Sequence, residues 1–393
     1  MPHTAIPTRD IFDAGHLGIR HETLRRTNEK AVLTVVGFNP NVSNAEISRL
    51  SGLSPQTVSA ILATLEADGL IERRPVVRGR RGQPATPIGL NKTGAFAIGV
   101  EIGWRHLCVA TVNFHGQVEA YRGAAHAFPD ATTIFDTIAA MAGELLAELP
   151  EEHRTRLLDI GVAMPRDLAA NLDLIGAPAG QIALWRNVDV IAELKARTGL
   201  EITTLNDGNC GLWAELIGLP RPRPANILYF LCSQRVAAAV IVNGKLIEGP
   251  AGGGANLGAM LLETDADGPL DVHAAASVAA LSQVLAKAGK KPDLSNWQSW
   301  GEESPERNIW IKGAAKALAR TAFNAMTVIE SPLVVLDTVL DKAVTELLAE
   351  QFRVELAALP VRNFEPPGVI VGQFGRMAPT IGAAELPLFR RYF

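Results

Sequence analysis

The chain has 393 residues, and because hydrophobic cores stop growing near about 250 to 300 residues, this length predicts two or three domains. Its composition of 48% hydrophobic, 20% charged and 6% aromatic residues is that of a folded globular protein and excludes the disordered, collagen-like and coiled-coil classes. The net charge of −4 argues against nucleic-acid binding when it is averaged over the whole chain, because phosphate contacts need clustered Lys and Arg.

The start of the chain and the cysteines bear on the compartment. Residues 1–20 lack the basic start and apolar core of a secretory signal, and no apolar run approaches the roughly 20 residues of a membrane span. Cys108, Cys210 and Cys232 lie far apart, so they predict neither a disulfide framework nor a thiolate zinc site. We therefore expect a cytoplasmic protein that makes no membrane contact.

The charge is divided unevenly along the chain. Residues 1–92 contain 12 Lys and Arg against 8 Asp and Glu, a net charge of +4, whereas the rest contains 25 against 33, a net charge of −8. Within residues 71–92 a single acid, Glu72, accompanies six basic residues. Charge by itself is also typical of a solvated loop, so the elements around it decide the interpretation. The six basic residues are Arg73, Arg74, Arg78, Arg80, Arg81 and Lys92.

Two short helices follow a first predicted helix over residues 23–36. Ser43 and Glu46 have the spacing of a capping box at the start of the second helix. Ser54 can cap the third, whose apolar residues recur at helical spacing until Gly69. This order is typical of a helix-turn-helix, in which the last helix enters the major groove of DNA. A three-helix packing unit would also explain the helices alone.

A winged helix is predicted because two strands, over residues 70–74 and 85–90, flank the basic stretch 76–84. Slim arginines of such a wing can enter a narrow minor groove, and the exposed start of the last helix carries hydroxyl and amide groups that can bond bases or phosphates. The helices, the strands and the charge together favour DNA binding. The expected DNA-binding residues are Ser54, Gln56, Thr57, Ser59, Arg78, Arg80, Arg81 and Gln83.

The remainder of the chain contains an internal repeat. Residues 96–122 and 226–248 each predict a meander of strands, and helical segments over 132–149 and 273–288 follow the two copies. Such a repeat predicts two stacked α/β lobes, with a cleft between them where a small ligand binds. The strands of the first copy are expected over 96–102, 106–113 and 117–121.

The order of segments resembles the ROK family, which comprises repressors, open reading frames and sugar kinases, from about residue 20 to the end of the chain. The segments that carry the resemblance are RRGQPATPIGLN, IGVEIGW, GVAMPRDL, LWRNVDV, LNDGNCGLWAE, IVNGKLIEG, GGGANLGAM and FGRMAPTIGAAELPLF. The resemblance implies an α/β fold, in which an N-terminal winged helix-turn-helix precedes a two-lobed, actin-like (ribonuclease-H-like) body and the C-terminal helix packs on the first lobe. The implied domains are a DNA-binding domain over 1–92, a first lobe over 93–215 plus 375–393, and a second lobe over 216–374.

Sugar kinases of this family need loops that surround the ATP phosphates. Here Trp104 fills the space of the first loop, the second loop, residues 232–237, contains no glycine, and Asp337 and Thr338 replace a glycine pair at the nucleotide approach. Asp207 matches the catalytic base of the family. Without a phosphate cradle the resemblance implies that Asp207 accepts a hydrogen bond from a ligand hydroxyl and that the chain is not an enzyme. An Asx turn before the next helix would also explain this residue.

The sugar site that the resemblance implies is altered. Asn206 and Asp207 match the family motif, whereas Asn256 stands for a glutamate, and Asp271 aligns with a later one. A glycine-rich turn and a helix cap would explain the last two positions nearly as well. Arg166 stands where the family prefers glycine, and it either favours an anionic ligand at the cleft mouth or points into solvent. The expected effector-binding residues are Arg166, Asn206, Asp207, Asn256, Asp271 and His273.

The structural zinc of the family is not expected here. Ala259 stands at the position of the histidine ligand, and residues 261–269 contain no cysteine. The sequence therefore predicts no metal and no cofactor.

Together these features predict a DNA-binding transcriptional regulator, in particular a repressor of genes for carbohydrate or polyol metabolism. It is expected to bind a double-stranded operator as a homodimer or dimer of dimers. A sugar, polyol or sugar derivative in the cleft would change the placement of the two wings. Two alternatives stay open, a sugar-kinase-like enzyme and a regulator that has lost its effector.

Overall fold

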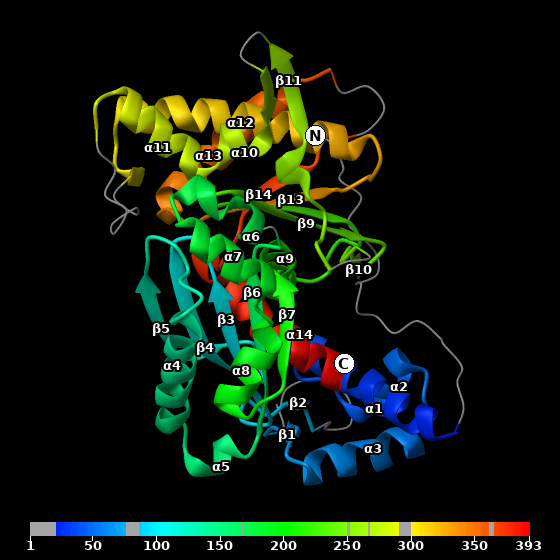
Figure 1. The fold of residues 1–393 in the computed structure, drawn as a ribbon. Helices are drawn as coiled ribbons and strands as arrows, with labels where there is room; N and C mark the ends of the chain where they lie inside the picture. Colours follow the sequence, from blue (N-terminus) through cyan, green and yellow to red (C-terminus); the bar gives the residue numbers. More distant parts are fainter. Residues whose placement is uncertain are drawn as a thin grey trace.

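The computed structural model describes residues 21–75, 86–166, 168–249, 252–265, 268–290, 300–360 and 365–393. Four residues of the predicted wing, Arg78, Arg80, Arg81 and Gln83, lie outside the described residues. A small N-terminal unit lies beside a larger body with two five-stranded sheets (Figure 1). None of the helices in the described ranges is long and apolar enough to cross a membrane.

The N-terminal unit has the elements of a winged helix, as predicted. The capping box is confirmed, since the Ser43 side chain accepts from the Glu46 N–H and Glu46 Oε2 accepts from the Ser43 N–H at 2.8 Å. Gly52 ends this helix with a φ of 72°, a conformation that glycine adopts without strain. Two short strands pair antiparallel at the base of the wing. The elements are α1 (His21–Phe38), α2 (Asn44–Ser51), α3 (Pro55–Ala67), β1 (Ile71–Arg73) and β2 (Ile88–Leu90).

The first lobe contains a sheet with strand order β5-β4-β3-β6-β7. The first two predicted strands are confirmed at their predicted bounds, and the third runs over Val118–Ala125, beyond the predicted end. The strands are β3 (Phe96–Ile102), β4 (His106–Asn113), β5 (Val118–Ala125), β6 (Leu157–Met164) and β7 (Ile202–Asn206). The helices are α4 (Ile134–Glu148), α5 (Glu151–Arg154), α6 (Leu168–Asn171), η1 (Leu172–Ile175), α7 (Ala179–Asn187) and α8 (Val190–Thr198).

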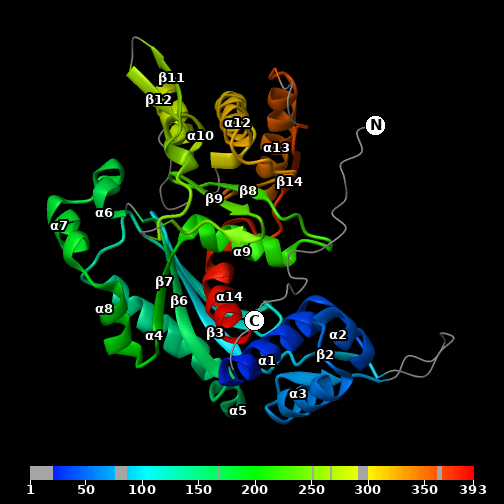
Figure 2. The same ribbon diagram turned by 90° about the vertical axis from the view of Figure 1, so that its right-hand side faces the viewer.

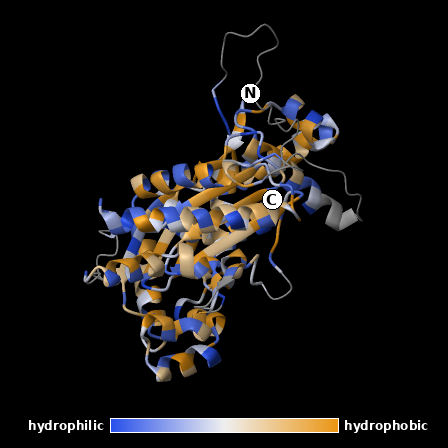
Figure 3. Ribbon diagram, turned by 90° about the horizontal axis from the view of Figure 1, so that it is seen from above, coloured by the Kyte–Doolittle hydropathy of each residue, from blue (hydrophilic) through white to orange (hydrophobic). Residues whose placement is uncertain are grey.

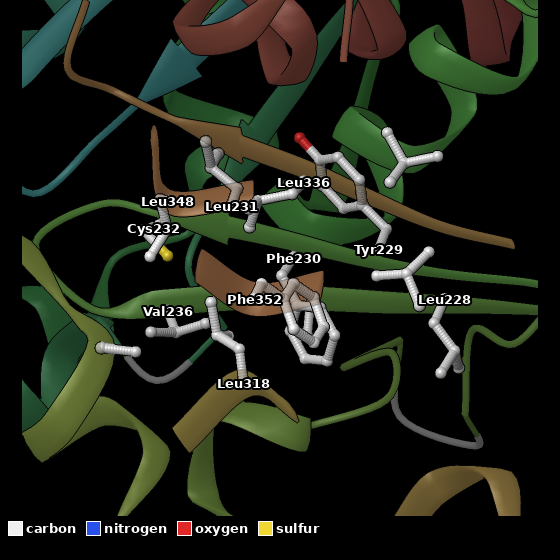
Figure 4. Packing of buried hydrophobic residues seen from close by; sticks show 14 of the residues in the cluster. Leu228, Tyr229, Phe230, Leu231, Cys232, Val236, Leu318, Leu336, Leu348 and Phe352 are labelled. Atoms are coloured by element: carbon white, nitrogen blue, oxygen red, sulfur yellow. The ribbon is translucent and has the colours of Figure 1, made fainter. Parts of the chain in front are cut away.

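The second lobe repeats this plan with strand order β10-β9-β8-β13-β14. The strands are β8 (Ile227–Cys232), β9 (Val236–Val242), β10 (Lys245–Leu246), β13 (Leu333–Thr338) and β14 (Gly368–Val371), and β11 (Leu261–Asp265) pairs with β12 (Gly268–Asp271). The helices are η2 (Leu257–Ala259), α10 (Val272–Ala276), α11 (Val278–Lys287), α12 (Pro305–Met326) and α13 (Lys342–Ala357). Figure 4 shows Phe230, Leu318 and Phe352 packed together on one face of this sheet.

The helical segment predicted over 273–288 consists of two consecutive helices, α10 and α11. Ser277 has an extended backbone, with φ −75° and ψ 163°, and its side chain accepts from the Ala280 N–H at 3.1 Å. It therefore caps α11 and separates it from α10.

Two helices lie between the sheets of the two lobes (Figure 2). α14 (Ala378–Tyr392), which follows η4 (Gly375–Met377), covers the first sheet, and α9 (Asp207–Gly218) packs between α14 and strands β8 and β9. The helices approach so closely that a Cβ atom at Gly382 would lie 1.8 Å from the carbonyl oxygen of Cys210. Figure 3 shows hydrophobic residues concentrated on the inner strands and hydrophilic residues on the outer helices.

The N-terminal unit is attached to the body through the C-terminal end of α14. The ring centroids of Phe38 and Phe393 are 5.7 Å apart, and those of Trp213 and Phe389 are 4.6 Å apart. Lys30 Nζ donates to the carbonyl oxygen of Arg390 at 2.7 Å. An aromatic cluster thus joins α1, α9 and α14.

Asp337 does not occupy an open nucleotide approach, contrary to expectation. Its side chain is buried at the end of β13 and accepts from Tyr229 Oη at 3.0 Å, on the face of the sheet opposite Phe230. Burial, together with the adjacent carboxyl of Glu215, raises the pKa of Asp337 to about 8, because both disfavour the charged form. Asp337 thus serves as a protonated hydrogen-bonding group of the interior at neutral pH.

We expect Asp337→Asn to remove a pH-dependent part of the stability. Because the folded-state pKa lies above the value of about 4 for an unfolded Asp, the contribution is present in full below about pH 4 and is lost as pH rises to about 8. The free energy of unfolding of the unmodified protein should therefore fall, relative to the variant, by up to about 1.4 kcal/mol per pH unit in this window. Urea unfolding at pH 5, 6.5 and 8 measures this. If the free energies of unfolding of the two proteins change with pH in parallel, the prediction is contradicted. Asp341→Asn, at an exposed position after the same strand, is the control.

Candidate functional site

A cavity of about 290 Å³ lies between the two lobes, beyond the carboxyl ends of β6 and β7. Ligands of open α/β sheets bind at this edge of the sheet, and the volume suits a small molecule. From the first lobe it is lined by Trp104, Pro165, Arg166, Asn206 and Asp207, and from the second by residues 235–238, 253–256 and His273.

Asn206 and Asp207 enter the cavity from the start of α9. Asn206 is the N-cap, since its Oδ1 accepts from the Asn209 N–H at 3.1 Å. Asp207 is the first residue of the helix and does not lie in a turn before it. Its Oδ1 accepts from the Gly208 N–H at 2.8 Å and from Asn206 Nδ2 at 3.2 Å. The helix N-terminus and these donors fix the position of the carboxylate, whose side chain is 8% exposed.

Arg166 lines the cavity and is itself exposed to solvent. A Cβ atom at Gly253 would lie 2.1 Å from Nη1 and 2.4 Å from Cδ of Arg166, so the side chain lies flat across this glycine. The glycine therefore makes room for the guanidinium at the wall of the cavity.

His273 and Asn256 line the cavity from the second lobe. Nδ1 of His273 accepts from the Val236 N–H at 3.2 Å, which places the proton of the neutral imidazole on Nε2. The ring is 8% exposed and packs on Gly258, where a Cβ atom would lie 2.2 Å from Cε1. His273 thus connects β9 to η2 and presents one edge to the cavity.

Asp271 does not line the first cavity. It is the N-cap of α10, with Oδ1 accepting from the Ala274 N–H at 2.8 Å. It lines a second cavity of about 290 Å³, which shares Trp104, Arg235 and His273 with the first. Trp104 is buried and contributes to the walls of both cavities.

The sequence did not single out Arg235, which lines both cavities from the turn between β8 and β9. The sequence feature that could have identified Arg235 is its charge within residues 232–237, the segment that replaces a glycine-containing loop. Its significance depends on the opposite lobe, because Arg235 shares the cavity with Arg166 and Asp207.

Glu101, near the end of β3, is bound within the protein. Its Oε1 is 3.1 Å from Nε2 of His106, and its Oε2 accepts from Thr380 Oγ1 at 3.2 Å. Burial disfavours the imidazolium, but the charge and hydrogen bond of Glu101 outweigh it and raise the pKa of His106. This carboxylate therefore links β3 and β4 to α14.

The residues do not fit the zinc site of the implied family. Ala259 ends η2, and the β11–β12 hairpin that follows has no cysteine or histidine in its sequence. Within the described ranges, no group of three or more His, Cys, Asp and Glu residues is placed to hold a metal ion.

The predicted DNA-binding residues of α3 lie at its exposed N-terminal turn. Ser54 is the N-cap and accepts from the Thr57 N–H at 3.2 Å, with the two side-chain oxygens 2.9 Å apart. Ser59 Oγ accepts from Asn44 Nδ2 at 2.9 Å, and Gln56 is exposed. The turn thus presents polar groups at the face where a helix-turn-helix meets DNA.

Comparison with known proteins agrees with this architecture. The model of the ROK family matches residues 97–388, and that of the MarR family matches residues 24–82. The xylose repressor of Bacillus subtilis is 22% identical over 248 residues, which are 63% of this chain and 62% of the repressor. A ROK family transcriptional regulator, a homologue of the E. coli MLC protein, superimposes with a TM-score of 0.66 at 16% identity, over 94% of this chain and 98% of that one. A ROK family glucokinase from Streptomyces griseus, in complex with glucose and AMPPNP, superimposes with a TM-score of 0.60 at 17% identity, over 74% of this chain and 99% of that one.

We expect Asn206 to stabilise the protein as the N-cap of α9. Asn206→Ala should lower the free energy of unfolding by about 1 kcal/mol, because the first turn of α9 loses its acceptor. Asn206→Ser should restore most of this stability, since serine also caps helices well. Equilibrium urea unfolding of the three proteins measures the difference. Equal losses in both variants would show that the cap does not stabilise α9.

Proposed function

The chain belongs to the ROK family, and we propose that it is a DNA-binding transcriptional regulator, in particular a repressor of carbohydrate or polyol metabolism genes. In this proposal the winged helix binds a double-stranded operator, with two copies on two half-sites as a homodimer or dimer of dimers. A sugar-like effector binds in the cavity between the lobes. The similarity to the xylose repressor supports the combination of operator and sugar.

The observation that carries this proposal is that one helix connects the cavity to the winged helix. α9 begins at Asp207 in the cavity and carries Trp213 and Ile217 near its other end. There they line an apolar pocket of about 80 Å³ together with Phe38 of α1 and Phe389 of α14. In this proposal, a displacement of α9 caused by a ligand is transmitted to the base of the winged helix.

The segment after α9 adds polar contacts at this junction. Arg223 donates to the carbonyl oxygens of Leu216 and Ile217 at 2.8 and 3.0 Å, which satisfies the end of α9, and its guanidinium lies 5.3 Å from the ring centroid of Phe38. Arg221 donates to the carbonyl oxygen of Phe38 at 2.9 Å and to Asn39 Oδ1. The end of α9 is therefore tied to the end of α1 by charge-assisted hydrogen bonds.

Within this proposal the cavity binds and does not catalyse phosphoryl transfer. Such transfer depends on groups that stabilise the charge of the phosphates. Trp104 is buried between the two cavities, and Glu101 is engaged by His106 and Thr380. Asp207 is better suited to accept a hydrogen bond from a ligand hydroxyl, since it lies at the helix N-terminus.

Replacing Arg80 and Arg81 together by Ala tests DNA binding. If both contact phosphates, the slope of log affinity against log salt should decrease by about 2, because each lost contact removes close to one released counterion. Mobility shifts with the region upstream of the gene, at several salt concentrations, measure this. Lys312→Ala with Lys316→Ala, two exposed cations of α12, should leave the slope unchanged. An unchanged slope in the wing variant would show that these arginines do not contact the phosphate backbone of the DNA. DNA binding by the unmodified protein that does not depend on salt would overturn the proposed function.

Arg221→Ala tests the junction. The loss of its bonds to Phe38 and Asn39 should loosen the N-terminal unit, so the backbone amides at the end of α1 should exchange with deuterium faster, by roughly tenfold for a lost charge-assisted bond. Hydrogen exchange read by mass spectrometry measures this, with Arg186→Ala on the exposed face of α7 as the control. Unchanged exchange at α1 would contradict a coupling role for this contact.

A further inference from the structure

The cavity between the lobes holds two guanidinium groups, one from each lobe. Arg166 follows β6 in the first lobe, and Arg235 stands before β9 in the second. We propose that the ligand is an anionic sugar, that is, a sugar bearing a carboxylate or phosphate group, and that this group binds between Arg166 and Arg235. The inference rests on the proposed function, because it names the chemical class of the effector.

The position of Arg166 is the first support. Its side chain lies across Gly253, at distances of 2.1 and 2.4 Å from the place of an added Cβ atom, so it is directed along the cavity wall. An arginine of the first lobe thereby contacts the glycine loop of the second lobe.

The position of Arg235 is fixed by the turn that carries it. Its carbonyl oxygen accepts from Ser233 Oγ at 2.7 Å and from the Ser233 N–H at 3.1 Å. The next residue, Val236, donates its N–H to His273. Because the backbone is held on both sides, the guanidinium is presented to the cavity from a rigid support.

The charge balance of the cavity is the second support. Among its described lining residues, Asp207 is the one acid, against the two arginines, and His273 is neutral when Nδ1 accepts a hydrogen bond. A carboxylate or phosphate group offers acceptors to both guanidiniums, and the planar fork of arginine matches its geometry. Asn206, Asn256 and Asp207 remain for hydroxyl groups.

Titration calorimetry on the purified full-length protein tests the proposal with matched pairs of ligands. Glucuronate is compared with glucose, galacturonate with galactose and xylonate with xylose, and glucose 6-phosphate separates phosphate from carboxylate. We expect one of the charged members to bind at least about tenfold more tightly than its neutral partner. The charged member should also weaken with increasing salt.

Three variants locate the anion. Arg166→Gln and Arg235→Gln should each weaken binding of the charged ligand at least about tenfold, and leave any binding of the neutral partner nearly unchanged. Gly253→Ala should act in the same direction, because its methyl group displaces Arg166 without altering the charge. Arg186→Gln, on the exposed face of α7, is the matched control. The comparison of charged and neutral ligands with the unmodified protein stands even if a variant does not fold.

Two outcomes would overturn the inference. Equal or tighter binding of the neutral sugars would exclude an anionic effector and leave the proposed regulator intact. Binding of neither class would remove the effector from the proposal as well, whereas operator binding by the same preparation would separately decide the DNA-binding part.

Discussion

The close packing of α9 against α14 is the constraint on which the rest of the molecule depends. The carbonyl oxygen of Cys210 lies where a Cβ atom of Gly382 would be, so this side of the pair has no room for a side chain. α14 covers the first sheet and α9 contacts the second, so the pair of helices packs against both lobes. The cavity opens at the start of α9 and the winged helix is attached near its end. α9 thus contributes residues to both places.

Polar groups buried beside this pair make its position specific. Glu215 on α9 accepts from the N–H groups of Gln373 and Phe374 at 2.7 Å, and the neighbouring carboxyl of Asp337 accepts from Tyr229. On the other side, Glu101 joins His106 to Thr380 of α14. Buried polar groups tolerate few arrangements, because each lost partner costs about 1 to 3 kcal/mol. The interior thus favours discrete positions of the helices over continuous sliding.

The sequence was a good guide to local structure and a poor one to contacts between lobes. Strands rich in apolar residues, such as Phe96–Ile102, and caps such as Ser43 depend on neighbours in the chain, and they were predicted correctly. The break at Ser277 was missed because the apolar spacing continues through it. The direction of Arg166 depends on Gly253, which is distant in sequence, and the importance of Arg235 arises from the opposite lobe. Asp271 matched by alignment, yet as a helix cap it faces the second cavity.

A cleft with groups from two lobes is suited to signalling for a thermodynamic reason. A ligand shifts a conformational equilibrium by no more than the difference between its affinities for the two states, and roughly a 10⁴-fold difference is needed to move a population from 1:99 to 99:1. Contacts to one lobe are the same in both states and contribute nothing to this difference. Arg166 and Arg235 belong to different lobes, so a ligand that binds both gains the second contact in the arrangement that brings them together. In the proposed regulator, the free energy of binding such a ligand would be available to displace α9 instead of stabilising a transition state, as it does in a kinase.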